Sequence, residues 1–195
     1  MDNIELIVCY KEDSKKRKEN KNKFIEYWKD WQVTLIEDYK ERAPAFNEAA
    51  RNSTNKYIAL ADIDAIIPYE QMQPLGDVTY PYSYIVDVDE NGNKRMPWGR
   101  YWRYGLMIIF DRAKFLEFGG ENENFKGYGW DDLERFFRAL NYGLDVMQVE
   151  GPAYHMQHDS LYHEQHVTNP YSVDNWKLMN KQRMKYELGE YYEKV

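Results

Sequence analysis

Three short apolar runs in the first third of the chain constrain its fold more than any other feature. They are residues 4–10, 33–36 and 57–61, and each has the length and composition of a buried strand. Between the first two, aromatic residues recur at the spacing of one helix face: Phe24, Tyr27, Trp28 and Trp31. Between the second and the third, Pro44 suits the first turn of a helix that runs to about residue 53. Strands that alternate with helices predict an α/β fold with a parallel sheet and helices on its faces.

In the rest of the chain, the residues that predict loops, strands and helices are more widely spaced. Residues 68–103 hold four of the seven prolines and favour loops, with a tight turn at Asn91-Gly92. Further strands are expected at residues 84–88, 106–110 and 144–149, the last of these being the last strand of the chain. Further helices are expected after the capping residue Asp111, from Asp131 to Gly143, and over residues 173–192.

Length, charge and cysteine content restrict the class of protein to which this chain can belong. A chain of 195 residues is expected to form a single domain, residues 1–195. The formal net charge of -7 disfavours nucleic-acid binding, because affinity for a phosphate backbone depends on Lys and Arg. The single cysteine, Cys9, excludes an internal disulfide and fits a reducing compartment. The sequence shows no membrane-spanning stretch and no signal peptide, so we expect a soluble, cytoplasmic protein.

Two aspartates follow the third apolar run. Asp62 and Asp64 project to the same side of an extended segment, a geometry that holds a divalent cation against phosphates. Such pairs also arise by chance, and Asp87 and Asp89 form a second one. The segment from Asp87 resembles the start of a calcium-binding loop, but its twelfth position is Trp98 instead of Glu, which excludes an EF-hand. Parallel sheets bind ligands at the carboxyl ends of their strands, which favours Asp62 and Asp64.

Histidines are the second group of candidate metal ligands. His155 and His158 lie three residues apart, close enough to share one ion on a helix or a tight turn. A mixed set of carboxylates and imidazoles suits manganese or a similar first-row ion better than calcium. All four histidines fall between residues 155 and 166, so the alternative is a cluster of surface histidines. Their assignment as ligands therefore depends on the aspartates.

Acidic and aromatic residues meet at the start of a predicted helix. Asp131 and Asp132 lie at its N-terminus, where the helix dipole favours carboxylates and where one of them could serve as the N-cap. Gly129 lets a ligand approach the backbone closely. Tyr128 and Trp130 offer flat surfaces for a sugar or a nucleotide, or else belong to the core. The aromatic content of 16% is compatible with either use.

Together these motifs resemble a known enzyme family. The motifs that carry the resemblance are Phe46-Asn47 with Arg51-Asn52, the run at 57–61 with Asp62-Ile63-Asp64, the block Phe125-x-Gly127-Tyr128-Gly129-Trp130-Asp131-Asp132, and His155-x-x-His158. In order and spacing they resemble the inverting glycosyltransferases of GT-A fold, in particular the catalytic domains of β-1,4-galactosyltransferases and chondroitin polymerases. The resemblance covers nearly the whole chain. It implies an α/β fold with a Rossmann-like, mostly parallel central sheet flanked by helices.

The resemblance also implies an activity and a division of the chain. The activity is metal-dependent, inverting transfer of a hexose or N-acetylhexosamine from a nucleotide diphosphate sugar, such as UDP-galactose, to a hydroxyl of a glycan acceptor. The cofactor would be Mn²⁺ or Mg²⁺. Residues 1–67 would form the nucleotide-binding half, residues 68–170 the donor-sugar and acceptor half, and residues 171–195 a C-terminal helix.

The resemblance assigns a role to individual residues. The metal would be held by Asp64, His155 and His158. Asp132 would be the catalytic base, and Asp131 would hold an acceptor hydroxyl. A larger set would contact the nucleotide sugar: Tyr10, Lys11, Asp38, Arg51, Asp62, Trp102, Tyr104, Tyr128, Gly129 and Trp130.

The sequence departs from the family pattern at four positions. Tyr128, Trp130 and Asp131 stand where Trp, Gly and Glu are usual, which affects acceptor recognition. Glu48 replaces a common basic residue near the nucleotide. Two other classes of protein remain compatible with the residues. A metal-dependent phosphodiesterase or nuclease would use the same aspartates and histidines. A non-catalytic carbohydrate-binding module would use the aromatic residues.

Overall fold

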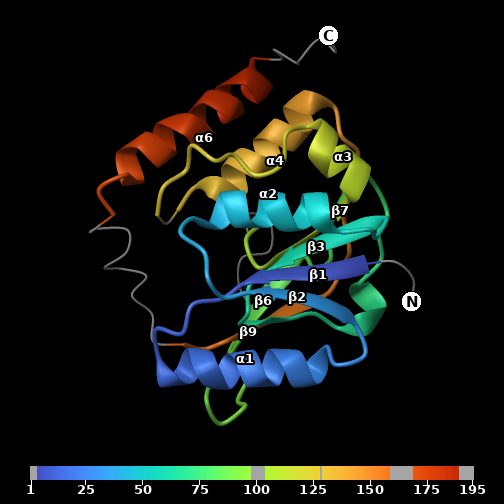
Figure 1. The fold of residues 1–195 in the computed structure, drawn as a ribbon, viewed down its shortest axis with the longest axis vertical. Helices are drawn as coiled ribbons and strands as arrows, with labels where there is room; N and C mark the ends of the chain where they lie inside the picture. Colours follow the sequence, from blue (N-terminus) through green and yellow to red (C-terminus); the bar gives the residue numbers. More distant parts are fainter. Residues whose placement is uncertain (1–3, 98–103, 128, 159–168, 189–195) are drawn as a thin grey trace.

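A central sheet organises the molecule (Figure 1). The computed structural model describes residues 4–97, 104–127, 129–158 and 169–188. The strands of the sheet, in spatial order, are β2 (Gln32–Ile36), β1 (Ile4–Cys9), β3 (Tyr57–Ala61), β7 (Met107–Asp111), β5 (Val78–Tyr80) and β8 (Val146–Gln148). β7 runs antiparallel to β3 and β5, whereas the other pairs are parallel. The predicted α/β fold with a mostly parallel central sheet is therefore confirmed.

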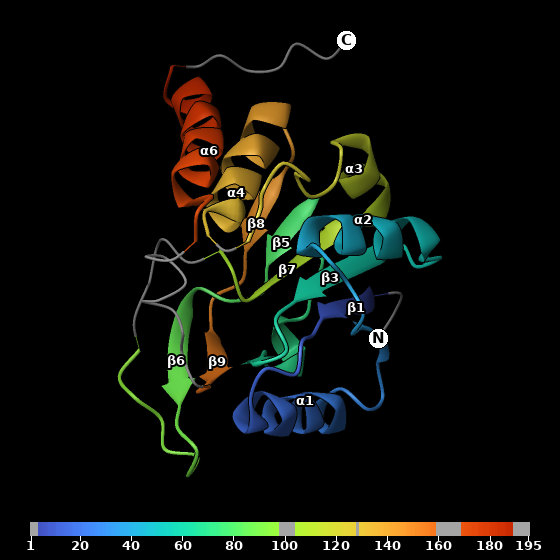
Figure 2. The same cartoon turned by 60° about the vertical axis from the view of Figure 1, so that its left-hand side comes forward.

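Helices cover both faces of this sheet. α1 (Lys15–Tyr27) lies on one face, and α2 (Arg42–Asn52), α3 (Arg112–Glu117) and α4 (Asp131–Tyr142) lie toward the other (Figure 1). α6 (Ser172–Glu187) packs against α4 on the side away from the central sheet (Figure 2). Within the described residues, no helix has the length and apolar content that crossing a membrane requires.

Two hydrophobic cores result from the alternation of side chains along β1. Leu6 faces the core under α1, where Trp28 is fully buried. Its neighbour Ile7 faces the opposite core, together with Phe46 of α2. The predicted aromatic face of the first helix is confirmed where it packs on the sheet, although Trp31 lies beyond the end of α1.

A second, smaller sheet continues from the end of β3. Its strands are β4 (Ala65–Ile66), β9 (Pro152–Met156) and β6 (Tyr84–Val88), with β9 in the middle. β9 pairs antiparallel with β4 and parallel with β6, and in this register His155 lies opposite both Ala65 and Asp87. The smaller sheet therefore brings together three segments that are far apart in the sequence.

The sequence does not predict β5, β9 or the smaller sheet. The expectation that the strand at residues 144–149 is the last in the chain is wrong, because β9 follows it. β9 begins at Pro152 and carries His155, so it lacks the continuous apolar run of a buried strand. The expected turn at Asn91-Gly92 is present, with Gly92 at a φ of 81°. Its second arm meets β6 only through an isolated bridge between Val88 and Lys94.

Capping residues set several helix boundaries as the sequence predicts. Asp111 accepts hydrogen bonds from the amides of Ala113 and Lys114 at the start of α3, at 2.9 and 3.2 Å. Gly143 ends α4 with a φ of 79°, a conformation that favours glycine. Of the expected C-terminal helix over 173–192, the last four residues lie outside the described part of the chain.

Candidate active site

The loop that leaves β3 carries the aspartates predicted as ligands. The Asp62 amide donates to the Leu106 carbonyl at 2.9 Å, which ties the loop to the segment before β7. The Asp64 carbonyl accepts from the Met156 amide of β9 at 2.7 Å, and Asp64 is buried. Burial of an isolated carboxylate is costly, so Asp64 requires cationic partners or a metal ion.

Two histidines approach Asp64 from β9 and from the residues that follow it. His158 Nε2 lies 3.1 Å from Asp64 Oδ2. One ligand atom of each of Asp64, His155 and His158 lies within 4.8 Å of the others. His155 Nδ1 lies 2.9 Å from Asp87 Oδ1, an arrangement that orients the other ring nitrogen toward an ion. One carboxylate and two imidazoles fit a first-row divalent cation such as manganese.

An arginine borders this cluster. Arg17, in the first turn of α1, places Nη2 3.6 Å from Asp64 Oδ2 and Nη1 3.4 Å from Asp13 Oδ2. Its Nε is buried and has no hydrogen-bond partner among the described residues. A guanidinium with donors to spare binds phosphate oxygens well, so Arg17 can contact an anionic ligand beside Asp64. The sequence did not single it out, because it belongs to a run of basic residues and only the fold shows which of them turns inward.

Asp62 has a different partner from Asp64. Arg42, in the first turn of α2, donates from Nη2 to Asp62 Oδ1 at 2.5 Å, and its guanidinium lies 5.1 Å from the centre of the Phe46 ring. Burial raises the pKa of the Asp62 carboxyl; the positive charge of Arg42 opposes this rise, and repulsion from Asp64 adds to it. Arg42 therefore holds Asp62 in one orientation.

Asp132 is fixed at the N-terminus of α4. Its Oδ1 accepts from Arg135 Nη2 at 2.9 Å, and the buried Arg135 also pairs with Glu121 at 3.0 Å and donates to the Tyr104 carbonyl at 3.3 Å. A β-carbon at Gly105 would lie 2.5 Å from Asp132 Oδ2, so no larger residue fits at position 105 unless Asp132 moves. The sequence did not indicate that Arg135 and Gly105 both lie against Asp132.

Asp131 has a strongly perturbed acidity. Burial, followed by repulsion from Asp132, raises the pKa of Asp131 to about 7, and Arg42 and Arg135 oppose this rise. Electrostatic interactions also connect Arg42 with Asp62, Asp131 and Asp132. The structure thus brings the acidic pair of α4 into one electrostatic cluster with the loop after β3.

Residues expected to bind the nucleotide lie where β1 and β2 end. Tyr10 is buried, and its hydroxyl lies 3.4 Å from Glu12 Oε2. Lys11 Nζ lies 4.4 Å from the centre of the Tyr39 ring. Asp38 is exposed in the connection from β2 to α2. These residues share the edge of the sheet that carries Asp62 and Asp64.

Arg51 is not brought to this edge. It lies in the last turn of α2, about 14 Å along the helix from Arg42 at 1.5 Å per residue. Its carbonyl accepts from Arg112 Nη2 at 2.9 Å, which anchors the far end of α2. Arg42, and not Arg51, is the residue of α2 that contacts an aspartate of the site.

The aromatic residues expected at the sugar site differ in their surroundings. The Tyr104 ring stacks on Phe136 with centroids 4.1 Å apart, so one of its faces is taken up by packing. Trp130 packs on a small cluster with Phe125 and Phe137. It has a φ of 72°, which makes it the single non-glycine residue with positive φ in the described chain. Gly129 also has a positive φ, 103°, whereas Trp102 and Tyr128 lie outside the described residues.

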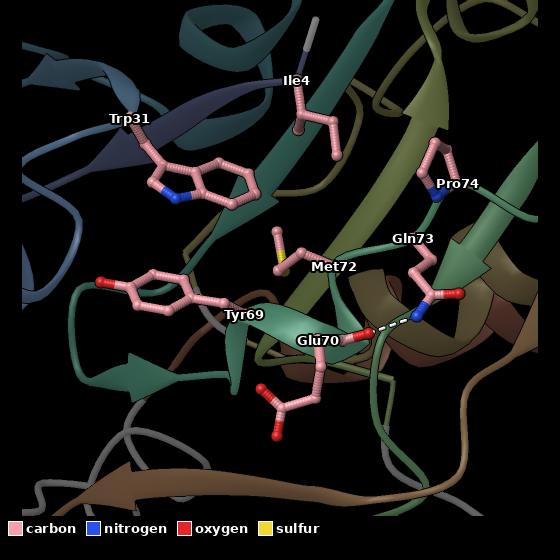
Figure 3. A pocket seen from close by; sticks show the side chains of 7 residues that line it. All are labelled: Ile4, Trp31, Tyr69, Glu70, Met72, Gln73 and Pro74. Carbon is pink, nitrogen blue, oxygen red and sulfur yellow. Dashed lines mark hydrogen bonds between the residues drawn. The ribbon is translucent and has the colours of Figure 1, made fainter. Parts of the chain in front are cut away.

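A surface pocket of about 460 Å³ lies apart from this cluster (Figure 3). It is lined by Ile4, Trp31, Tyr69, Glu70, Met72, Gln73 and Pro74. Ile4 begins β1, so the pocket lies at the amino end of the strand whose carboxyl end leads to the site, roughly 20 Å away. With one carboxylate and no histidine in its lining, it does not offer the groups assembled around Asp64.

Comparisons with known proteins concern the fold. No protein-family model and no curated protein sequence matches the chain. Two crystal structures of Drosophila β1,4-galactosyltransferase 7 align with it, one in complex with xylobiose and one a mutant with manganese, UDP-Gal and xylobiose. Their TM-scores are 0.53 and 0.59 at 18% and 17% identity, and the alignments cover 76% and 85% of this chain and 65% and 74% of theirs.

A mannosyltransferase from Pyrobaculum calidifontis, in complex with GDP-Man and Mn²⁺, aligns with a TM-score of 0.54 at 13% identity, covering 88% of this chain and 62% of its own. The chain thus spans between 62% and 74% of the length of these three structures. At such identities the likeness shows the architecture, and the chain has the GT-A fold of glycosyltransferases.

Proposed function

We propose that this protein is a metal-dependent, inverting glycosyltransferase that moves a hexose or N-acetylhexosamine from a nucleotide diphosphate sugar to a hydroxyl of a glycan acceptor. The observation that carries the proposal is the convergence of Asp64, His155 and His158 beyond the end of β3 on a GT-A fold. Structures with this fold hold Mn²⁺ with UDP-Gal or with GDP-Man. A UDP-linked sugar, with UDP-galactose first, is the donor to test.

Asp64, His155 and His158 would hold Mn²⁺ or Mg²⁺. When bound, the ion neutralises the diphosphate and makes it a better leaving group. Arg17 lies beside Asp64 and contributes a second positive charge to the phosphates. Asp87 keeps the His155 ring in its orientation through the contact at Nδ1.

We assign nucleotide binding to the edge where β1, β2 and β3 end. Tyr10, Lys11 and Asp38 line this edge, and Arg42 holds Asp62 ready to accept a hydrogen bond from a ribose hydroxyl. We assign binding of the donor sugar to the residues identified from the sequence: Trp102, Tyr104, Tyr128, Gly129 and Trp130. Arg51 is left out, since it lies near the far end of α2.

Asp132 is the proposed catalytic base. Arg135 holds its carboxylate in one orientation through a hydrogen bond to Oδ1. Asp132 takes the proton of the acceptor hydroxyl as that oxygen bonds to the anomeric carbon, while the bond from that carbon to the diphosphate oxygen breaks. The nucleoside diphosphate leaves with the electron pair, and this single displacement inverts the anomeric configuration. Asp131, with a pKa of about 7, holds a second acceptor hydroxyl by a hydrogen bond.

A panel of nucleotide sugars with and without manganese tests the proposal. The correct donor should raise the melting temperature only in the presence of the metal, because ligand binding stabilises the folded state. With a glycan acceptor it should yield a product of inverted anomeric configuration. The Asp64→Ala and His158→Ala variants should lose manganese-dependent nucleotide binding, and calorimetry that shows unchanged affinity in both would contradict the metal assignment.

The same panel separates the two other classes of protein. Hydrolysis of a phosphodiester without any sugar product would favour a phosphodiesterase or nuclease. Glycan binding that requires neither metal nor nucleotide would favour a carbohydrate-binding module.

A further inference from the structure

The surface pocket at the amino end of β1 has a wall of aromatic rings (Figure 3). Trp31 and Tyr69 lie along one side of it, with an angle of 11° between their ring planes and 6.1 Å between their centroids. Gln73 lies across from them, and Met72 lies between (Figure 3). The sequence grouped Trp31 with the aromatic face of the first helix, but it lies beyond the end of α1 and its side chain is only partly buried. Trp31 and Tyr69 therefore present aromatic surface to a ligand in the pocket.

Both rings are held in place by their neighbours. Tyr69 stacks on Tyr27 with 4.5 Å between centroids, and its hydroxyl donates to the Tyr27 carbonyl. The fully buried Trp28 meets Tyr69 and Trp31 edge-on, with 5.2 and 4.9 Å between centroids. A ligand that stacks on rings fixed in this way loses little affinity to the ordering of side chains. The aromatic wall is thus preorganised for binding.

Polar groups at the rim complete the pocket. Glu70 is exposed, and its carboxylate has no ion pair or hydrogen bond with any residue that the structure describes. Gln73 donates from Nε2 to the Glu70 carbonyl, which leaves its Oε1 as an acceptor. A carboxylate and an amide oxygen both accept hydrogen bonds from hydroxyl groups. Since the buried Ile4 and Met72 add apolar surface, the pocket combines flat apolar faces with hydrogen-bond acceptors.

We propose that this pocket is a second carbohydrate-binding site, which holds a neutral glycan of β-linked pyranose units. Such sugars carry their hydroxyls at the edge of each ring and present a flat face of C–H groups, which stacks on an aromatic ring. The pocket volume of about 460 Å³ lies in the range of small-ligand sites. The carboxylate of Glu70 and the net charge of -7 repel an acidic glycan, which favours a neutral one.

The arrangement of the rings favours a sugar over an organic cation. A quaternary ammonium group is bound in an aromatic cage, in which rings surround the charge. Trp31 and Tyr69 are nearly parallel and lie on one side of the pocket, so they offer flat faces without enclosing a charge.

The pocket lies roughly 20 Å from the ion site along β1. A glycan held there is anchored away from the reacting hydroxyl, and its binding requires neither metal nor nucleotide. The inference therefore goes beyond the proposed function and is tested separately from it. A binding module would hold glycan in this pocket without any transfer, whereas a glycosyltransferase would also transfer sugar in a reaction that depends on Asp132.

Nuclear magnetic resonance with cellobiose and chitobiose tests the proposal. With metal chelated and nucleotide left out, either disaccharide should shift the indole N–H signal of Trp31, which the Trp31→Leu variant identifies by its absence. Trp31→Leu keeps apolar contact with Trp28 but removes the flat ring, and it should weaken binding about tenfold or more. Glu70→Ala should weaken binding roughly fivefold, because a sugar hydroxyl loses a charged acceptor.

Matched substitutions outside the pocket serve as controls. Trp176→Leu removes an indole that is 44% exposed on α6, and Glu117→Ala removes an exposed carboxylate from α3. Both should bind the disaccharides like the wild type, and so should Asp64→Ala, which lacks a ligand of the ion site. Circular dichroism should show every variant folded. The proposal is overturned if neither disaccharide shifts the Trp31 signal, if Trp31→Leu and Glu70→Ala both bind as tightly as the wild type, or if tetramethylammonium binds the pocket in place of the sugars.

Discussion

Among the single residues of the site, Asp132 is held from two sides. Arg135 donates to Oδ1 at 2.9 Å, and Gly105 lies so close to Oδ2 that a β-carbon there would overlap with it. A base that is fixed before the substrate arrives needs no reorganisation during the reaction. This rigidity supports Asp132 as the base and Asp131 as its neighbour with a different role.

The Asp132→Asn variant tests this division. It should lower the rate of transfer by about 10²- to 10⁴-fold, because an amide cannot accept the proton of the acceptor hydroxyl. Manganese-dependent binding of the donor, measured by calorimetry, should remain near that of the wild type. The Asp131→Asn control should retain measurable transfer with a raised KM for the acceptor. Transfer at the wild-type rate in Asp132→Asn would refute the base assignment.

Asp131 should make the stability of the protein depend on pH. Its pKa is raised from 3.8 to about 7, so the folded state holds this proton more tightly than the unfolded chain does. The free energy of unfolding should therefore receive a contribution from Asp131 that falls as the pH rises from about 4 to about 7 and is constant above that range. Asp131→Asn should gain stability relative to the wild type across this interval. Urea denaturation measures the difference, and parallel pH profiles of the two proteins would contradict the expected acidity.

Asp87 should tune the metal site without touching the ion. Its Oδ1 lies 2.9 Å from His155 Nδ1, so Asp87→Asn should weaken manganese binding by about 10- to 100-fold, as is usual when a partner of a ligand histidine is changed. Asp89→Asn is the matched control, because Asp89 is half-buried like Asp87 but accepts from the amides of Asn91 and Asn93 in the turn. Calorimetry with manganese alone measures both. Equal affinities in the two variants would show that Asp87 does not orient the ligand.

The residues that the sequence identified and those that it missed differ in a physical way. Asp64, His155 and His158 carry chemistry that is recognisable from residue type and local spacing. Arg17 and Arg42 do not stand out from the other basic residues of the chain. Arg42 reaches Asp62 across 20 residues of sequence. Such contacts depend on how two elements meet, which local patterns do not encode.

At the scale of elements, buried ion pairs tie α4 to its surroundings. Arg135 Nη1 lies 3.0 Å from Glu121 Oε1, with side-chain exposures of 3% and 5%. One turn later Arg138 donates to Glu134 at 2.9 Å and to the Gly120 carbonyl at 2.7 Å. Because Asp131 and Asp132 occupy the first turn of the same helix, these contacts also fix the end of α4 that faces the site.

The Glu121→Gln variant should reveal how much the ion pair between Arg135 and Glu121 contributes to the free energy of unfolding. It removes one of the two carboxylates that pair with the buried Arg135, the other being Asp132, and the free energy of unfolding should fall by about 1–3 kcal/mol. Glu117→Gln is the control, because Glu117 pairs with Lys114 on the surface, and it should change stability by less than about 1 kcal/mol. Urea denaturation compares the two variants. Equal losses would mean that the buried pair contributes no more than a surface one.

Helices and strands with a strong local sequence pattern have the bounds predicted from the sequence. Those without such a pattern were not predicted. β3 has the bounds that its apolar run predicts, and α4 runs from Asp131 to the glycine that stops it. β5 has three residues and β4 has two, too short for a periodic pattern. β9 mixes Pro152 and His155 with apolar residues, and it becomes a strand through pairing with β4 and β6. These segments are strands because they pair with strands that are distant in the sequence.

At the scale of the whole molecule, the two cores share one sheet. Leu6 and Ile7 of β1 face opposite cores, so neither core can lose its packing without exposing a face of β1. We expect a single cooperative unfolding transition, in which tryptophan fluorescence and far-ultraviolet circular dichroism change together. Manganese should shift both signals to higher temperature by the same amount. Two separate transitions would show that the halves of the molecule unfold independently.

The ligand geometry of the site depends on the alignment of a two-residue strand. β4 pairs Ala65 with His155, and the bond from the Met156 amide to the Asp64 carbonyl extends that pairing by one step. Successive side chains of a strand point to opposite faces, so a slip of one residue would turn His155 away from Asp64 and would also turn Ala153 of β9 out of the core under α1. A chain with one residue inserted before β9 would therefore lose the ion site together with part of this core. In this molecule the register between β4 and β9 determines the metal site as much as the identity of the ligands does.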